Sequence, residues 1–439
     1  MNLISKKLLG GLLVVGIVPA TLLLTSCSTK STEPFDHGID AETQNYYGSK
    51  ISADQAKATR RTMLITAGGR INDKSFNQSA WESMQLYKTQ AGIIDNDSIA
   101  FRETDDDSGL PAAYDQALSG GYKTWVLTSF QQATPFKSWL EKSDNKAKFI
   151  KSKAIVVGVD WDGSSFVPEG QFLGLGFKTQ ESSWVVGYAA SEYLSTTDTP
   201  YLSSFGGGEF DGVTDFNNGF LQGMLDWNTN NPTKPVKFHS GNKQASTINL
   251  NTGFLVNSET VSIIDAIVGV GDNVPQITLP VSGSLTATML ENINSKDSGQ
   301  MIIGVDSNQS LAFPSNKTKF FSSVEKKIAV GVYKAMILLA GIPLDFTSGN
   351  TNDQGFEGDF KANGKSALVK YGFDKGMIGY SPSTLAGEEA AKVNALLENA
   401  YKIFLTLKPI EPSKDYFKPM TDSSKNQVIL DAMIAQINK

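Results

Sequence analysis

The chain has 439 residues, enough for two or three domains of ordinary size. Hydrophobic residues make up 40% and charged residues 19%, which indicates a globular protein rather than a disordered or fibrous one. The formal net charge of -6 argues against a general nucleic-acid binder, which normally carries a basic surplus. One cysteine excludes an intrachain disulfide and a cysteine-rich zinc site, and two histidines leave little room for a histidine-based metal centre. We therefore expect no metal and no cofactor.

The first 27 residues read as a secretory signal. Lys6 and Lys7 form a positive start, residues 8–24 are apolar, and small residues precede Cys27. This arrangement resembles a bacterial lipobox, in which the cysteine receives diacylglycerol and further acyl chains such as palmitate. The alternative is an uncleaved anchor that ends at a chance cysteine. Under either interpretation we expect the bulk of the chain at the extracellular face of the cell membrane, and under the first it is lipid-anchored there.

Residues 28–58 are polar, contain few aliphatic side chains and read as a flexible tether. Fully stretched, about 30 residues reach roughly 100 Å. His37 lies in this segment, and we expect it to be a solvated tether residue.

From residue 61 short apolar runs alternate with glycine-rich loops and helical stretches. Parallel α/β proteins show this alternation, because helices cover both faces of their buried strands. In a first series we expect strands at 62–66, 125–127, 154–159 and 172–177, and helices at 75–90 and around 184–189. In a second series we expect strands at 201–205, 235–238, 277–281, 301–305 and 320–324, helices at 215–227 and 326–339, then a strand at 377–380 and helices at 388–407 and 428–437.

Two series of similar size predict two doubly wound lobes. The sequence divides accordingly into lobe 1 at 59–197 plus 325–345, lobe 2 at 198–324 plus 366–385, an inserted loop at 346–365 and C-terminal helices at 386–439.

Catalytic motifs are weak throughout the chain. The run 364–366 reads Gly-Lys-Ser, but the first glycine of a P-loop is replaced by Asp359. The acidic run 105–107 lacks the EF-hand spacing, and the three glycines at 206–208 lack a dinucleotide fingerprint. His239 has no nucleophile elbow nearby, and paired carboxylates are left open. The sequence therefore argues against an enzyme.

Residues 68–84, which read GGRINDKSFNQSAWESM, resemble the signature loop of the basic membrane protein family of bacterial lipoproteins. That family includes the purine nucleoside receptors of ABC transporters. Further segments are similar to other family motifs in the same order, at 175–181, 187–190, 279–283, 303–309 and 371–379. The resemblance implies a type I periplasmic-binding-protein fold, in which two doubly wound parallel-sheet lobes joined by three crossover segments hold a ligand in their cleft. The partners that it implies are a nucleoside or related small molecule and an ABC permease, with a monomeric receptor and no nucleic acid.

Seven residues are candidates for ligand binding: Phe76, Asn77, Asp160, Trp161, Gly283, Asp306 and Lys326. A nucleoside has an aromatic base, which Phe76 can stack on, and Asn77 offers a donor and an acceptor to the base edge. Asp306 ends a buried strand at the edge where open sheets bind ligands, and its carboxylate can accept from two ribose hydroxyls. We expect Phe76 and Asp306 to face each other across the cleft.

Three further candidates have expected roles in holding the ligand. Lys326 can donate to a ribose oxygen and offset the charge of Asp306, Asp160 can hold the ligand from the first lobe, and Gly283 permits close backbone approach. Each candidate also has a structural alternative. Phe76 would be plain core, Asn77 an N-terminal helix residue, the two aspartates strand ends and Lys326 a solvated helix start.

Three positions depart from the family pattern. The family usually has a ligand-contacting Asp where this chain has Ala67, and the first Asp of its signature loop is Asn72 here. Its second stacking Phe is replaced by Leu279. We expect Trp161, next to Asp160, to supply the missing ring.

The sequence thus predicts a membrane-anchored substrate-binding lipoprotein of an ABC importer that captures nucleosides by hinge closure. Two alternatives stay open: a sugar-binding lipoprotein of the same fold, and a surface adhesin or host-interaction lipoprotein without a transport role.

Overall fold

The computed structural model describes residues 38–51, 61–95, 97–198, 200–241, 247–271, 274–342, 368–407, 416–421 and 424–439. The signal segment with Cys27, the position of His37 and the expected inserted loop at 346–365 lie outside the described residues. Within the described ranges, no helix combines the length and apolarity that a bilayer span requires.

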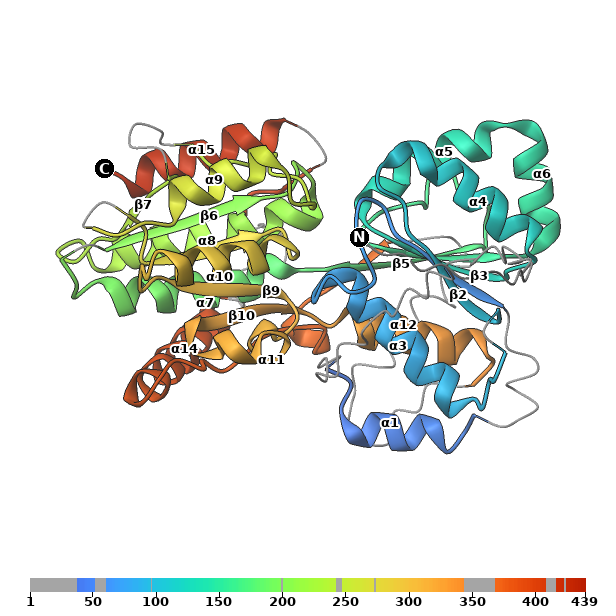
Figure 1. Ribbon diagram of the computed structural model, residues 1–439, viewed down its shortest axis with the longest axis horizontal. Helices are drawn as coiled ribbons and strands as arrows, with labels where there is room; N and C mark the ends of the chain where they lie inside the picture. The colour runs from blue at the N-terminus through green and yellow to red at the C-terminus, as the bar shows by residue number, and fades with distance from the viewer. Residues whose placement is uncertain are drawn as a thin grey trace, which may run out of the picture. The chain divides into compact units, whose positions relative to one another are not determined.

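Lobe 1 is built on a six-stranded sheet in the order β11-β5-β4-β3-β1-β2 (Figure 1). All neighbouring strands are parallel. The strands β1, β3 and β5 are buried along their whole length, as expected for a parallel sheet with helices on both faces. The bounds are β1 Thr62–Ile65, β2 Ile99–Arg102, β3 Thr124–Thr128, β4 Ile155–Val159, β5 Phe172–Phe177 and β11 Leu368–Tyr371.

Side chains that alternate along these strands feed two separate cores. Leu64 and Val126 pack with α3 (Phe76–Gln90) and α12 (Ile328–Leu339) on one face of the sheet. Met63 and Trp125 pack on the opposite face. The helices on that face are α4 (Leu110–Ser119), α5 (Ala133–Glu141) and α6 (Ser143–Ser152), and the short 3₁₀ helix η1 (Asp107–Gly109) precedes α4.

Lobe 2 repeats this plan with the order β12-β10-β9-β8-β6-β7, in which β12 is antiparallel to β10 and the other pairs are parallel. The strands are β6 Tyr201–Gly206, β7 Lys237–Phe238, β8 Ile277–Val281, β9 Met301–Asp306, β10 Phe320–Lys326 and β12 Ile378–Tyr380. The helices are α7 Thr179–Leu194, α8 Asp211–Asn230, α9 Ser258–Ile267, α10 Leu285–Ser295, α11 Gln309–Ala312, α14 Glu388–Leu407 and α15 Lys425–Ile437, and the further 3₁₀ turns are η3 Pro314–Lys319 and η4 Phe373–Lys375. The expected pair of doubly wound lobes is therefore confirmed.

In the part of the chain that the structure describes, three crossovers join the lobes, and the first and third lie away from the expected boundaries. The chain passes from β5 to α7, from β10 to α12 and from β11 to β12. Helix α7, expected in lobe 1, packs on α8 of lobe 2, and β11, expected in lobe 2, pairs with β5. Glycines allow the close packing of α7 on α8, since a Cβ on Gly219 would lie 2.1 Å from the carbonyl oxygen of Gln180.

Part of the expected tether is folded onto lobe 1. Residues 41–48 form α1 (Ala41–Gly48), whose first turn is capped by Asp40 through a 2.7 Å hydrogen bond from the Thr43 amide. Tyr47 is 2% exposed and packs edge-on against Tyr333 of α12. The tether expectation is wrong for this stretch, because a few spaced apolar side chains suffice to dock a short helix on an existing core.

Candidate functional site

A cavity of about 470 Å³ lies where the carboxyl ends of the two sheets meet. Both sheets have the strand order 2-1-3-4-5 within their own series, and such sheets bind ligands at the carboxyl edge beside the reversal in strand order. Lobe 1 contributes the loops after β1, β3 and β4, and lobe 2 contributes the start of α8, the loops after β8 and β9, and the end of β10. The volume lies within the range of small-molecule sites.

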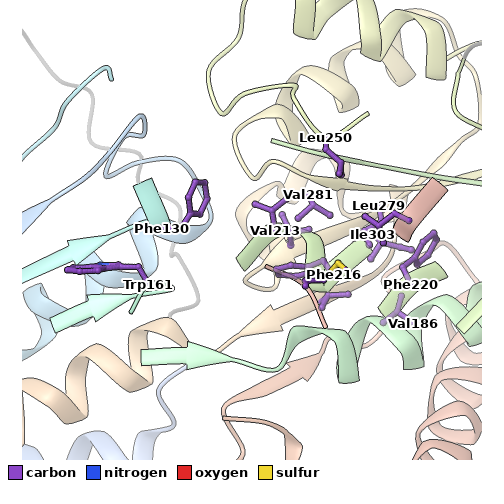
Figure 2. Packing of buried hydrophobic residues seen from close by; sticks show 14 of the residues in the cluster. Phe130, Trp161, Val186, Val213, Phe216, Phe220, Leu250, Leu279, Val281 and Ile303 are labelled. Atoms are coloured by element: carbon purple, nitrogen blue, oxygen red, sulfur yellow. The ribbon is translucent and has the colours of Figure 1, made fainter. Parts of the chain in front are cut away.

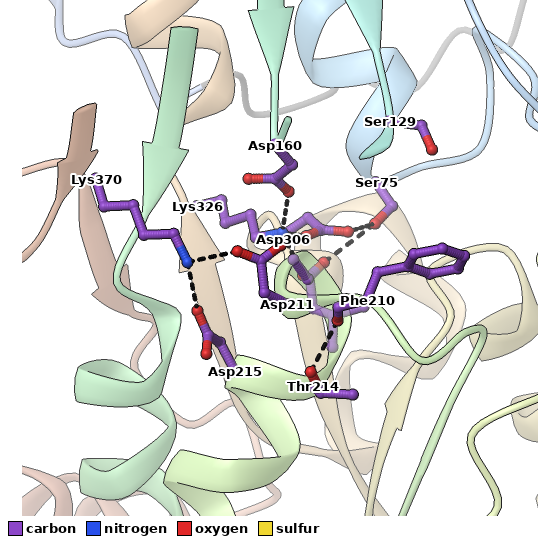
Figure 3. A network of polar contacts seen from close by, with 12 residues as sticks. Ser75, Ser129, Asp160, Phe210, Asp211, Thr214, Asp215, Asp306, Lys326 and Lys370 are labelled. Carbon is purple, nitrogen blue, oxygen red and sulfur yellow. Dashed lines mark hydrogen bonds and ion pairs between the residues drawn. The ribbon is translucent and has the colours of Figure 1, made fainter. Parts of the chain in front are cut away.

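Lys326 lines the cavity, is 4% exposed and reaches toward Asp160 (Figure 3). It is the last residue of β10 rather than the start of a helix, so its expected alternative as a solvated residue is wrong. Its ammonium bonds Asp160 of lobe 1, lies 3.8 Å from Oδ1 of Asp306 in lobe 2, and donates to the carbonyl of Gly212 at 2.8 Å. One cation thus links two carboxylates from opposite lobes.

The two carboxylates occupy matching places in the two lobes. Asp160 directly follows β4 and Asp306 ends β9, and both have a left-handed backbone, with φ of 64° and 66°. Aspartate tolerates this conformation better than most residues. Burial raises the pKa of Asp160 to about 6, although the Lys326 ammonium acts in the opposite direction. An unpaired charge at this position would therefore be costly, and ligand hydroxyls could share in solvating it.

The loop before α3 is held by a half-buried carboxylate that the sequence did not single out. Asp73 accepts hydrogen bonds from the backbone amides of Ser75 and Asn77 at 2.9 Å and of Gln78 at 3.1 Å. Burial raises the pKa of Asp73 to about 6, against the effect of these amides. Asn77 donates to Asp73 at 2.9 Å and accepts from Thr128 at 2.7 Å. Asn77 borders the cavity, but these bonds give its amide a positioning role within lobe 1.

The same loop contacts lobe 2 directly. Ser75 donates to Oδ2 of Asp306 at 2.6 Å, and Lys74 donates to the carbonyl of Ala312 at 2.8 Å. A Cβ on Gly283 would lie 2.2 Å from the Ser75 hydroxyl. The space beside Gly283 is therefore filled by a side chain of the opposite lobe, and the described cleft is closed.

Several phenylalanine rings line the cavity: Phe76, Phe130, Phe216, Phe254 and Phe313. The ammonium of Lys326 lies 5.3 Å from the ring centroid of Phe76 and 4.8 Å from that of Phe216. Both rings thus border the charged centre (Figure 2 shows Phe216). The sequence pointed to Phe76 and missed Phe216, because only packing shows which side of α8 faces the cleft.

Trp161 does not line the cavity, so the idea that it supplies a second ring is wrong. Its ring is 3% exposed within the core of lobe 1, edge-on to Phe172, and its indole N–H donates to the carbonyl of Leu127 at 3.0 Å (Figure 2). Because the chain turns sharply at Asp160, the side chains of Asp160 and Trp161 point in different directions. Leu279 is likewise buried, in the core of lobe 2.

A second ionic cluster lies beside the first, at the third crossover. Lys370 of β11 donates to Asp211 at 2.7 Å and to Asp215 at 3.2 Å, both on α8 (Figure 3). Burial raises the pKa of Asp215 to about 7, although Lys370 opposes this shift. Burial alone would lower the pKa of Lys370, but the two carboxylates outweigh it and raise that pKa.

The structure thus brings together six of the seven candidates and adds Asp73, Ser75 and Phe216.

Sequence comparisons relate the chain to known proteins. A family model described as ABC transporter substrate-binding protein PnrA-like (Bmp) matches residues 61–355. The ABC transporter nucleoside-binding protein BmpA of Lactococcus lactis subsp. cremoris is 26% identical over 174 residues, which are 39% of this chain. The matched region spans 45% of that relative.

Solved structures agree on the fold. A solute-binding protein of an ABC transporter system from Aeropyrum pernix superposes with a TM-score of 0.58 and 15% identity, over 86% of this chain and 99% of that one. A transcriptional activator of the comK gene from Bacillus halodurans superposes with a TM-score of 0.50 and 12% identity, over 80% and 98%. At such identities the likeness shows the fold alone, which is the expected periplasmic-binding-protein architecture.

Proposed function

The chain belongs to the Bmp family of ABC transporter substrate-binding proteins, and on that premise we propose that it captures nucleosides in the cavity between its lobes. As a solute-binding protein it is a receptor and not an enzyme. The observation that carries the nucleoside proposal is the pair of rings, Phe76 and Phe216, that flank a centre made of one ammonium and two carboxylates.

This arrangement suits both halves of a nucleoside. The rings offer flat apolar faces to a base, and stacking on an aromatic ring stabilises a bound base by about 1–3 kcal/mol. The carboxylates of Asp160 and Asp306 can accept from ribose hydroxyls through charge-assisted hydrogen bonds, while Lys326 can donate to a sugar oxygen. Because these groups come from both lobes, the ligand's contacts favour the closed state.

The charges of the lining favour a neutral ligand over a nucleotide. Three cations, Arg70, Lys74 and Lys326, stand against four anions, Asp73, Asp160, Glu291 and Asp306. Three minus four gives a formal charge of -1. Each cation has a protein partner: Arg70 bonds Asp105, Lys74 bonds a backbone carbonyl, and Lys326 bonds a carboxylate. A phosphate would find no uncommitted cation among these residues.

Anchoring and transport complete the proposal. Residues 24–27 support lipid attachment at Cys27, which would hold the receptor at the extracellular face of the membrane. The closed, loaded form would then be presented by a monomer to an ABC permease that imports the nucleoside. The family assignment supports the transporter partner.

A sugar is the second candidate, because Asp160, Asp306 and Lys326 could hold a polyol without any ring. The discriminating experiment first identifies, by mass spectrometry, any ligand released from purified full-length protein. Calorimetry on ligand-stripped protein then compares adenosine, guanosine, uridine, adenosine monophosphate and ribose.

We expect heat with at least one nucleoside and much weaker binding of the monophosphate. Phe76→Leu should weaken nucleoside binding about 5- to 150-fold, the equivalent of lost stacking, and leave ribose unaffected. Phe101→Leu is the matched control, since Phe101 lies outside the cavity lining and is 44% exposed. Binding of ribose without any nucleoside would establish the sugar instead, and no heat with any of these ligands would refute the proposed cargo.

A further inference from the structure

Two phenylalanine rings from opposite lobes stack on each other beside the cavity. Phe130 follows β3 in η2 (Phe130–Gln132), and Phe210 directly precedes α8. Their ring centroids are 3.4 Å apart with 21° between the planes. Phe130 lines the cavity wall, and Phe254 of lobe 2 lies 6.0 Å from it, centroid to centroid. Figures 2 and 3 show the two partners in turn. Opening the cleft at this side would separate the stacked rings.

Glycines just before Phe210 make room for its ring and for that of Phe254. A Cβ on Gly208 would lie 2.3 Å from the Phe210 ring, and one on Gly207 would lie 2.4 Å from the Phe254 ring. The glycine run at 206–208, which matched no phosphate-binding motif, therefore leaves room for aromatic side chains. The carbonyl of Phe210 accepts from the amide of Thr214 at 2.7 Å and from its hydroxyl at 2.8 Å.

The backbone on the other lobe is also specialised. Ser129 has φ of 87°, an uncommon value for a residue other than glycine, and it directly precedes Phe130. The Ser129 hydroxyl accepts from the amide of Gln131 at 3.3 Å, which supports this turn. A constrained turn thus presents Phe130 from lobe 1, and the N-terminus of α8 presents Phe210 from lobe 2.

We propose that Phe130 and Phe210 form an aromatic clasp that holds the two lobes closed and slows release of bound solute. The clasp joins the lobes through protein contacts alone, so it shifts the balance between open and closed forms whatever the solute is. Solute escape requires opening, and opening breaks the stack. The inference rests on the solute-binding fold and not on the nucleoside assignment.

The size of the effect follows from aromatic pair energies. A stacked aromatic pair favours the closed form by about two- to tenfold in the equilibrium constant between open and closed forms. This factor is additional to the effect of the apolar area that the rings bury. Replacing either ring by leucine keeps an apolar side chain and removes the stacking. We therefore expect Phe130→Leu and Phe210→Leu each to shift the open–closed balance toward open by about two- to tenfold, and the double variant to add little.

The first test measures closure without any solute. Spin labels on cysteines at Thr134 and Val256, exposed positions on opposite lobes, report the interlobe distance in full-length protein that carries Cys27→Ser. The expected result is a larger long-distance population in both clasp variants than in the parent. The control is Phe166→Leu, because Phe166 stacks on Trp161 within lobe 1, with centroids 6.2 Å apart, and joins no lobes.

The second test measures release of adenosine by stopped flow. Faster release from both clasp variants, with the Phe166→Leu rate unchanged, supports the clasp. Distance distributions in the clasp variants that match the parent would overturn it, whether or not adenosine binds. If adenosine fails to bind any variant but the distances shift, the clasp stands and the nucleoside proposal fails.

Discussion

The hydroxyl of Ser75, in lobe 1, donates a 2.6 Å hydrogen bond to Oδ2 of Asp306, in lobe 2. The other oxygen of the same carboxylate lies 3.8 Å from the ammonium of Lys326. Asp306 therefore serves two purposes at once, because it closes the cleft through Ser75 and faces the cavity centre beside Lys326. A solute that uses this carboxylate binds to a group already oriented by the opposite lobe.

Removing the Ser75 hydroxyl should weaken solute binding. Hydrogen bonds to charged groups contribute about 1.5–3 kcal/mol, so Ser75→Ala should raise the Kd for adenosine roughly tenfold or more. Calorimetry checks this, with Ser108→Ala as the control, since Ser108 is an exposed serine outside the cavity lining. Tighter binding by Ser75→Ala would contradict the prediction and would mean that Ser75 competes with the solute for Asp306.

Gly283 should be required for closure rather than for folding. A Cβ there would lie 2.2 Å from the Ser75 hydroxyl oxygen and 2.4 Å from the Ser75 Cβ, both on the opposite lobe. Gly283→Ala should therefore weaken adenosine binding at least tenfold while leaving the thermal midpoint nearly unchanged, because the open form has room for the methyl group. The double variant Gly283→Ala with Ser75→Gly removes the clash but also the Ser75 hydroxyl, so spin labelling should show it closed more often than Gly283→Ala and less often than the parent. Wild-type affinity of Gly283→Ala alone would show that no such approach occurs.

Trp161 should matter for stability and not for recognition. It is packed in the lobe 1 core, and its indole donates to the carbonyl of Leu127. Trp161→Phe leaves that buried carbonyl short of a partner, at a cost of about 1–3 kcal/mol in the free energy of unfolding. Chemical denaturation should show this loss, and calorimetry should give an unchanged Kd for adenosine. A weakened Kd with unchanged stability would restore Trp161 as a ligand contact.

The contribution of Asp215 to the stability of the protein should fall as pH rises between about 4 and 7. Burial raises the pKa of Asp215 to about 7, so in that window the folded state holds a proton that the unfolded state has released. More protons bound to the folded state mean that the free energy of unfolding decreases with rising pH, by up to about 1.4 kcal/mol per pH unit for one group.

Asp215→Asn should therefore flatten the pH dependence of the thermal midpoint between pH 4.5 and 7. Asp73 and Asp160, whose pKa values burial also raises, keep their own shares of the slope. The exposed Asp265, paired with Lys296 at the surface, provides the control as Asp265→Asn. An unchanged slope in Asp215→Asn would contradict the raised pKa.

Hydrophobic periodicity predicted most of the fold, and the polar residues at strand ends predicted most of the site. Asp160 and Asp306 could be placed because carboxyl ends of parallel strands gather at one edge of a sheet. The positions of Phe216 and Phe210 could not be predicted. Apolar and polar residues both occur on several sides of α8, so its orientation depends on packing against α7. The docking of α1 was missed because its apolar residues are few. Their role becomes evident only from the surface of lobe 1 that they cover.

The sequence by itself determined the two α/β series, their family motifs and the polar residues at the strand ends, because burial patterns and turn residues are local properties of the chain. Only the tertiary structure decided which lobe receives α7 and β11, that Trp161 turns into the core, and that Ser75 meets Gly283 and Asp306 across the cleft. These outcomes depend on contacts between separate elements, such as Leu368 with Gly174 and Ser75 with Asp306, or on the direction of a single side chain, and neither leaves a periodic signal.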